Sequence, residues 1–384
     1  MTQKKFLCYI AQLQNAVESR RLKFEPTVKS GFYPLLSVRV NDYFKRRGIS
    51  KKANRLMRVK IIFCLSLFFS SYVFILSGFF SSWTLFAMVI LFGISGALVG
   101  FNIGHDAVHN ALFKSAKLNR IFGYSFELIG MSSYAWYLKH NMVHHTNPNV
   151  CNADFDIEAS PLLRLSPADK LLPYHRWQHW YAPLPYMLFS LSRIFFDDFY
   201  VVLAEDRTTI DNRIHPQKEK ILLFVFKSAY IFMMLMLPML LLPLSWWQVI
   251  VGFLLMHFIL SIILAFILVP AHLFESTCYH YRNSAGKLEN DWAEHQMQST
   301  IDYAAGSHLC NFLFGGFNIN VAHHLFPHIC HVHLIDVSKI VRQTAEECGV
   351  TYHHTTLWGA MVSHFRALKR LGRQENFHPS LTFS

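Results

Sequence analysis

The sequence predicts an all-α integral membrane protein with four membrane-spanning helices arranged in two hairpins. Of its 384 residues, 52% are hydrophobic and 16% are charged, whereas a soluble domain usually has about 25% charged residues. Uncharged apolar runs occupy residues 61–80, 84–104, 228–247 and 248–270. Each is long enough to cross a bilayer, which takes about 20 residues. The runs are adjacent in pairs, so each pair forms a hairpin.

The distribution of charge predicts the orientation in the membrane. Eight basic residues precede the first run: Lys45, Arg46, Arg47, Lys51, Lys52, Arg55, Arg58 and Lys60. The turns inside the hairpins, from Gly78 to Trp83 and around Pro243, Trp246 and Trp247, carry no charge. By the positive-inside rule, both turns lie outside, and both termini lie in the cytoplasm. The formal net charge of +12 therefore indicates a membrane-surface anchor and not a nucleic-acid partner.

Five segments follow from this topology. They are a basic cytoplasmic N-terminal arm (1–59), a first transmembrane hairpin (60–104), a cytoplasmic or interfacial segment (105–220), a second hairpin (221–271) and a C-terminal cytoplasmic segment (272–384). The segment 105–220 is too aromatic for a separate soluble domain. Its composition suits helices that lie in the headgroup region.

Histidines are clustered in the segments that follow the hairpins. Residues four apart in a helix lie on one face, so each cluster can direct two or three imidazoles to one point. A further histidine follows the second hairpin directly. The predicted topology places all of them on the cytoplasmic side, where they can form one site held by a helical cap. The candidate ligands are His105, His109, His140, His144, His145, His272, His323 and His324.

An all-imidazole site selects against Mg²⁺ and Ca²⁺, and the seven scattered cysteines argue against an iron–sulfur cluster. Iron, zinc and copper remain. Eight nitrogens exceed the four ligands of a structural zinc and suit two five- or six-coordinate ions. A dinuclear iron site is the natural means of activating O₂ to remove hydrogen from an unactivated C–H bond.

Several side chains are candidates for supporting the ligands. Asp106, Asp154, Asp156 and Asp302 are expected to accept hydrogen bonds from imidazole N–H groups, or else to cap helices and turns. His295 either supports a ligand or lies near the substrate. His331 is expected at the surface or behind the ligands. The supporting candidates are Asp106, Asp154, Asp156, His295 and Asp302.

The motifs GHDAVHN, KHNMVHHTNPN, HRWQHWYAPL, AHLFES, WAEHQ and GGFNINVAHHLFPHI occur in this order within residues 95–345. This set resembles the integral-membrane fatty-acid desaturases, especially bacterial acyl-CoA or acyl-lipid desaturases related to the front-end (linoleoyl-type) enzymes. The resemblance implies O₂-dependent introduction of a cis double bond into a fatty acyl chain. It also implies that the eight histidines correspond to ligands of two iron ions, in a protein of the bacterial inner membrane.

The sequence departs from the front-end pattern in two places. Asn320 stands where those enzymes have Gln and other desaturases have His. Its carbonyl can bind metal directly or through a water, or the side chain can simply cap the local backbone. The haem-binding HPGG of a fused cytochrome b5 is absent from the sequence. The resemblance therefore implies a separate electron donor, of the ferredoxin or cytochrome b5 type with its reductase.

Other functions share parts of this pattern. A hydroxylase, a sphingolipid-modifying enzyme or a carotenoid ketolase would use the same metal site, but the similarity between the clusters favours a desaturase. A metal transporter would hold its ligands near the bilayer midplane, where only His257 lies. His257 has two interpretations. It is either a functional residue inside the membrane or a residue that packs against a neighbouring helix, and the second interpretation is favoured. Lys227 is expected to extend its amine to the membrane interface.

Overall fold

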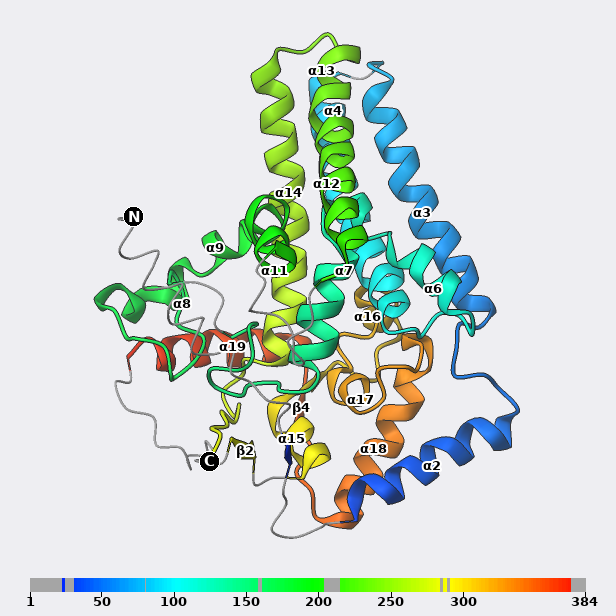
Figure 1. The fold of residues 1–384 in the computed structure, drawn as a ribbon, viewed down its shortest axis with the longest axis vertical. Coiled ribbons are helices and arrows are strands. Elements are labelled where there is room, and N and C mark those ends of the chain that lie inside the picture. The colour runs from blue at the N-terminus through cyan, green and yellow to red at the C-terminus, as the bar shows by residue number, and fades with distance from the viewer. Residues whose placement is uncertain are drawn as a thin grey trace.

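The computed structural model describes residues 23–24, 31–79, 81–157, 161–203, 215–283, 286–288 and 291–373. This part of the chain is mostly helical (Figure 1). Its strands are two parallel pairs of two residues each, β1 (Lys23–Phe24) with β2 (Lys287–Leu288) and β3 (Asp302–Tyr303) with β4 (His354–Thr355). The predicted all-α class is confirmed.

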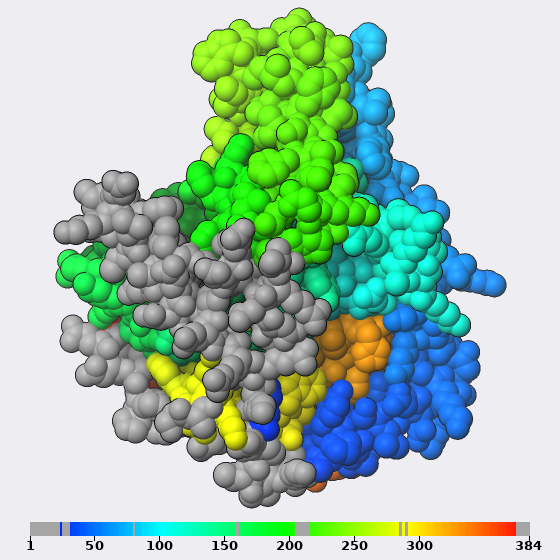
Figure 2. Space-filling view, in the orientation of Figure 1, coloured from blue at the N-terminus to red at the C-terminus, as the bar shows by residue number. Residues whose placement is uncertain are grey.

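Four long helical segments form the narrow upper part of the molecule, above a broad base (Figures 1 and 2). Within the described residues, these four are long and apolar enough to cross a membrane. The two predicted hairpins are therefore confirmed. The segments are Arg55–Leu76 (α3), Ser82–Val108 (α4, Ser82–Val99, a π-helical turn and α5, His105–Val108), Gln217–Leu241 (α12, Gln217–Ile231, a π-helical turn and α13, Leu237–Leu241) and Trp246–Ala271 (α14, Trp246–Leu268, and a 3₁₀ turn).

Two spans begin earlier than the uncharged runs predict. Helix α3 begins after Asn54, whose side chain accepts a hydrogen bond from the Met57 amide and so caps the helix. The third span begins at Gln217, ahead of the predicted residue 228. It includes Lys227, which is buried and does not extend to the interface as expected. Its Nζ donates to Asp198 Oδ2 at 2.7 Å, and this pairing permits a charge inside the helix.

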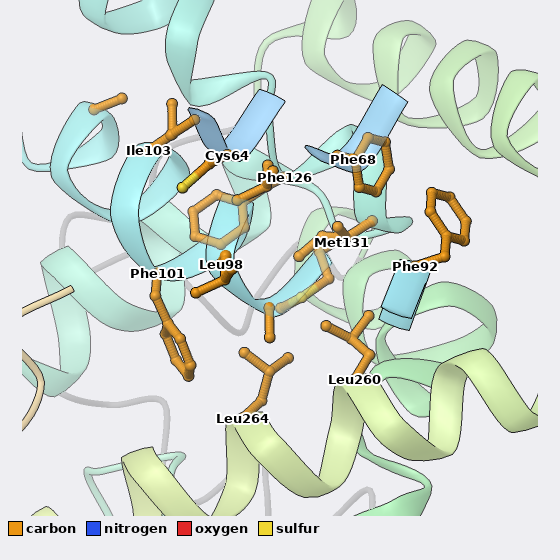
Figure 3. Close-up of a cluster of buried hydrophobic side chains, with 14 of the residues drawn as sticks. Cys64, Phe68, Phe92, Leu98, Phe101, Ile103, Phe126, Met131, Leu260 and Leu264 are labelled. Atoms are coloured by element: carbon orange, nitrogen blue, oxygen red, sulfur yellow. The ribbon is translucent and has the colours of Figure 1, made fainter. Parts of the chain in front are cut away.

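Helix α4 packs between α3 and α14 (Figure 1). A Cβ atom at Gly93 would lie 2.8 Å from the Met256 carbonyl oxygen, so glycine allows the two backbones to approach closely. Apolar side chains from α3, α4 and α14, including Phe68, Phe92 and Leu260, fill the interior beside this contact (Figure 3). This packing fixes the lower ends of α4 and α14 relative to each other.

His257 lies inside α14 with both ring nitrogens in hydrogen-bonding contact. Nδ1 lies 2.8 Å from the Ser190 hydroxyl, and Nε2 lies 2.9 Å from the Tyr230 hydroxyl. The side chain is fully buried. It thus joins α14 to α12 and to the interfacial segment, which agrees with the packing interpretation.

The base of the molecule combines the N-terminal arm with the C-terminal segment. Helix α2 (Phe32–Arg47) buries Phe32, Leu36 and Val40 in one apolar core with helix α18 (Leu334–Cys348). We call this base the cap. The described part of the predicted arm, residues 1–59, thus includes α2, whereas residues 1–22 and 25–30 lie outside the described part. The other cap helices are α15 (Trp292–Ser299), α16 (His308–Phe314), α17 (Asn320–Leu325) and α19 (Leu357–Leu371), with a 3₁₀ turn at His331–His333.

Short helices connect the two hairpins and surround the lower ends of the spans (Figure 1). Trp180 and Phe196 are 75% and 70% exposed, as expected for helices that lie against a membrane surface. The helices are α6 (Ala116–Gly123), α7 (Ser133–Trp136), α8 (Gln178–Tyr181), α9 (Pro183–Met187), α10 (Phe189–Ser192) and α11 (Asp198–Leu203), with 3₁₀ turns Glu127–Ile129 and Pro173–Trp177 and π-helical segments Tyr137–His144 and Arg193–Asp197.

Candidate metal centre

A π-helical segment directs the central histidines to one point. In an α-helix, residue i+5 lies well off the face of residue i, because each turn takes 3.6 residues. Residues Tyr137–His144 form a wider π-helix instead, in which the His145 amide donates to the His140 carbonyl at 2.9 Å. The wider turn brings i+5 back towards residue i. His144 and His145 can therefore both lie beside His140.

The structure brings all eight predicted histidines together in two groups. Within each group, one ring nitrogen per residue lies within 4.8 Å of the others. The candidate ligands come from the ends of the spans that contain α4 and α14, from the π-helical segment and the residue after it, and from α17 in the cap. The larger group is His105, His109, His140, His145 and His323, and the smaller group is His144, His272 and His324.

The spacing of the nitrogens suits metal ions. His140 Nε2 lies 3.3 Å from His105 Nε2 and 3.2 Å from His145 Nε2. In the smaller group, the Nε2 atoms of His144 and His272 are 3.1 Å apart. Two nitrogens bound about 2.1 Å from one ion at a right angle would lie about 3 Å apart. These separations fit neighbouring ligands of a metal.

Two buried ring nitrogens support the same conclusion. Among the described residues, His109 Nε2 and His324 Nε2 have no hydrogen-bond partner. A buried polar atom without a partner is unfavourable by about 1–3 kcal/mol, and a metal ion would supply the partner that these nitrogens lack. The residues present therefore fit a metal centre.

The opposite ring nitrogens of the smaller group are held by acceptors. His144 Nδ1 lies 3.1 Å from the Asp154 carboxylate, and His272 Nδ1 lies 3.2 Å from the Ser299 carbonyl oxygen. His324 Nδ1 lies 2.9 Å from Gln296 Oε1. Such contacts fix the tautomer and leave Nε2 free to bind metal. The sequence did not identify Gln296 as a supporting residue, because the neighbouring His295 was the candidate for that role.

Asp106 and Asp156 lie close to the candidate ligands but have other partners too. Asp106 Oδ2 accepts a hydrogen bond from His331 Nδ1 at 2.8 Å, while its other oxygen lies 3.8 Å from His105 Nδ1. Asp156 lies 3.4 Å from His144 Nδ1 and forms an ion pair with Lys139 at 2.9 Å. Both carboxylates therefore connect the site to basic side chains behind it.

The structure places two supporting candidates away from the ligands. Asp302 accepts hydrogen bonds from the Val321 amide at 2.8 Å and the Tyr352 hydroxyl at 2.6 Å. It thus holds the beginning of α17 instead of an imidazole, and burial raises its pKa to about 7. The His295 ring lies 4.4 Å from the ring of His280. Helix α15 turns Gln296, and not His295, towards the ligands.

Burial keeps most of the site neutral. It lowers the pKa well below the usual range for six of the candidate ligands, which favours the neutral imidazole that binds metal. His144 differs: burial also lowers its pKa, but the Asp154 carboxylate raises it, and the net shift is upward. The six are His109, His140, His145, His272, His323 and His324.

Asn320 lies beside the smaller group. Its side-chain Nδ2 is 2.8 Å from His272 Nε2, and the residue is 1% exposed. A half-turn of the amide would present its oxygen at this position. The side chain is therefore close enough to complete the coordination of an ion held by His144, His272 and His324.

A cavity of about 520 Å³ reaches the histidines from the side of the interfacial helices. It ends at His140, His144, His272 and Asn320, and most of its remaining wall is apolar. A concave apolar site with a few polar groups at one end suits a hydrocarbon substrate. The wall includes Leu163, Leu165, Tyr186, Phe189 and Leu268.

Four spans, a histidine centre at their lower ends and an apolar cavity define a membrane enzyme that acts on a hydrocarbon chain. The family model for fatty acid desaturases matches residues 81–356. The chain belongs to the fatty acid desaturase family and is an oxidoreductase, as the motifs predicted.

Similar proteins carry related names. The sn-1 linoleoyl-lipid 6-desaturase of Synechocystis sp. is 32% identical over 361 residues, which cover 92% of this chain and 99% of that protein. The sn-1 linoleoyl-lipid 6-desaturase of Arthrospira platensis is 29% identical, covering 89% and 92%. The acyl-lipid (8-3)-desaturase of Physcomitrium patens is 31% identical, covering 92% and 74%. The similarity extends well beyond the histidine motifs.

Proposed function

We propose that this desaturase uses two iron ions and O₂ to introduce a cis double bond into an acyl chain esterified to a membrane lipid. The convergence of eight imidazoles at the end of an apolar cavity carries the proposal. The larger histidine group would hold one iron and the smaller group, with Asn320, the other. When bound, the iron supplies the activation of O₂ and the removal of hydrogen from the acyl chain.

The chain's own residues position and shield the reacting carbon atoms. The apolar wall holds the acyl chain and excludes water from the end of the cavity. Asp154, Gln296 and the Ser299 carbonyl keep three imidazoles in the required orientation. The names of the relatives favour an acyl-lipid substrate over acyl-CoA. Two electrons per turnover would come from a separate ferredoxin or cytochrome b5 with its reductase.

The test is expression in a bacterial host that lacks this activity and is supplied with linoleic acid. Gas chromatography–mass spectrometry of the lipids should show a new, more unsaturated acyl chain, and the purified protein should contain about two iron ions per chain after iron-replete expression. A hydroxylated product would identify the hydroxylase alternative. Active protein with one zinc and negligible iron would refute the di-iron centre.

We further propose that both termini and the metal centre face the cytoplasm of a bacterial inner membrane. The segments 1–59, 105–220 and 272–384 would then lie on the cytoplasmic side of hairpins 60–104 and 221–271. This orientation places the basic residues before α3 inside, as the positive-inside rule requires.

Cysteine labelling of exposed positions should reveal this topology. Phe79→Cys, in the turn of the first hairpin, should react with an impermeant maleimide in intact spheroplasts. Lys117→Cys and Lys339→Cys, in the interfacial segment and the cap, should react only after permeabilisation. All three positions are exposed. Labelling of Lys117→Cys and Lys339→Cys on opposite sides of the membrane would exclude a single metal centre.

Asn320 provides a graded test of the smaller metal site. Asn320→Ala should retain part of the iron and reduce activity about 10- to 100-fold, because weak ligands and supporting groups typically contribute this much. Asn320→Gln restores the amide of the front-end enzymes and should remain active. Iron content and product yield, measured together, check both expectations. Wild-type values in Asn320→Ala would limit Asn320 to a hydrogen bond with the local structure.

A further inference from the structure

A second pocket, of about 440 Å³, opens where the end of helix α19 meets the 3₁₀ turn before α8. None of the described residues that line it is acidic. Each of the two segments contributes an arginine, and the turn also contributes apolar side chains. The pocket shares no lining residue with the apolar cavity of the metal centre. Its wall includes Leu171, Leu172, Arg176, Trp177 and Arg373.

The charges of the two arginines are not neutralised by a neighbour. Arg176 and Arg373 are exposed, and among the described residues neither side chain has an ion pair or a hydrogen bond. The guanidinium carbon of Arg176 lies 5.5 Å from the centroid of the Trp177 ring, and this cation–π contact leaves its N–H donors available. Burial lowers the pKa of His179, and the charges of Lys369 and Arg373 lower it further. Positive charge is therefore in excess at this end of α19.

Buried contacts hold the two arginine-bearing segments together. Gln178, which is fully buried, donates from Nε2 to the Leu368 carbonyl at 2.7 Å. A Cβ atom at Gly372 would lie 2.0 Å from the His175 carbonyl oxygen, so glycine allows the end of α19 to lie directly against the turn. The fold thus fixes the positions from which the two arginines extend.

The pocket opens among the helices that we expect against the membrane surface. Trp177, in its wall, is 51% exposed, and Trp180, in α8, is 75% exposed. Exposed tryptophans of this kind are typical of the membrane–water interface, where the lipid headgroups lie. Helix α19 is in contact with α8 (Figure 1). Both arginines therefore lie close to the expected headgroup region.

We propose that this pocket binds the phosphate group of an anionic phospholipid, such as phosphatidylglycerol, from the surrounding membrane. A guanidinium group matches two phosphate oxygens with parallel N–H donors, and basic pockets at a membrane surface recognise such headgroups. The leucines and Trp177 would contact the glycerol and the first methylene groups, which a free phosphate ion lacks. A choline headgroup would bring its own cation towards two arginines. The proposal does not depend on the proposed function of the metal centre.

The turn that carries Arg176 is also bonded to the wall of the apolar cavity. The Tyr174 hydroxyl donates to the Pro161 carbonyl at 2.7 Å. The next two residues, Leu162 and Leu163, line the cavity. A bound headgroup would thus hold this part of the wall at the membrane surface, and the protein should be more stable with the lipid than without it.

The experiment titrates the full-length protein, purified in a neutral detergent, with dihexanoyl phosphatidylglycerol and follows binding by calorimetry. Dihexanoyl phosphatidylcholine and inorganic phosphate are titrated for comparison. Wild type should bind phosphatidylglycerol more tightly than either, and added salt should weaken this binding. Arg176→Gln and Arg373→Gln should each weaken it about three- to tenfold, because exposed ion pairs contribute modestly. The two changes combined should weaken it about 10- to 100-fold.

Arg366→Gln serves as a control on the same helix, because Arg366 is exposed but already pairs with Glu275 at 3.4 Å. It should bind phosphatidylglycerol as wild type does. Arg176→Lys keeps the charge without the two-pronged contact and should be intermediate. Thermal unfolding without lipid should show that every variant is folded, and phosphatidylglycerol should raise the midpoint of wild type but not of the double variant.

Two results would overturn the proposal. Equal affinity of wild type and the double variant for phosphatidylglycerol would show that the arginines do not bind the headgroup. Equal affinity of wild type for phosphatidylglycerol and inorganic phosphate would show that the pocket binds a soluble anion and not a lipid.

Discussion

Replacement of His323 by alanine is expected to abolish desaturation while the four spans remain folded. His323 comes from α17 in the cap, and its Nε2 lies 3.1 Å from Nε2 of His145, the residue that follows the π-helical segment. The variant would remove the contribution of the cap to the larger histidine group. The loss of a nitrogen ligand should lower the iron content to about one ion per chain or less. Product analysis and metal analysis of the same preparation check this result.

His328→Ala is the matched control. It follows His323 within the same part of the cap, but its side chain is exposed. This variant should retain its iron and its activity. Size-exclusion chromatography in detergent would show whether His323→Ala is still folded. Full activity and two iron ions in His323→Ala would remove this residue from the ligand set, and the larger group would then have four histidines.

The second large effect is expected for Asp198→Ala, through stability. This variant leaves Lys227 buried without its carboxylate partner, beside Arg193. Removal of one partner from a buried ion pair typically destabilises a protein by about 3–5 kcal/mol. Asp198 also accepts a hydrogen bond from the Ser132 amide, which would be lost. Thermal unfolding in detergent should show a clearly lower midpoint.

Two variants separate the charge effect from general damage. Asp197→Ala removes a neighbouring carboxylate that is only half-buried and accepts a hydrogen bond from the Ser192 hydroxyl, so a small change is expected. Asp198→Ala combined with Lys227→Met removes both charges and should recover part of the lost stability. If the double variant unfolds as readily as Asp198→Ala, the unpaired lysine is not the cause.

The sequence predicts the spans well because the bilayer requires a certain length and an apolar composition. Both properties can be read from one continuous stretch of the chain. It predicts their ends less well. The third span was predicted to begin after Lys227, because this lysine was expected at the membrane interface. Its actual partner, Asp198, is 29 residues away in the chain, and only the packing of α11 against α12 brings the two charges together.

The candidate ligands were predictable because two of the motifs space histidines by one helical turn. Their supporting groups were not. WAEHQ offers both His295 and Gln296, and only the rotation of α15 selects Gln296 as the partner of His324. The partner of Asp302 could not be predicted from the sequence either. An aspartate near a histidine motif can hold either an imidazole or a backbone amide, and here the amide of Val321 is its partner.

The order of the histidines along the chain has a consequence for biosynthesis. The first candidate ligand is residue 105 and the last is residue 324, and each of the two groups includes a histidine from α17. A nascent chain must therefore insert all four helices and synthesise most of the cap before either metal site is complete. With the proposed iron centre, metal delivery would then be a late, post-insertional step. Under iron starvation, cells would accumulate a membrane-embedded apoprotein that awaits its metal.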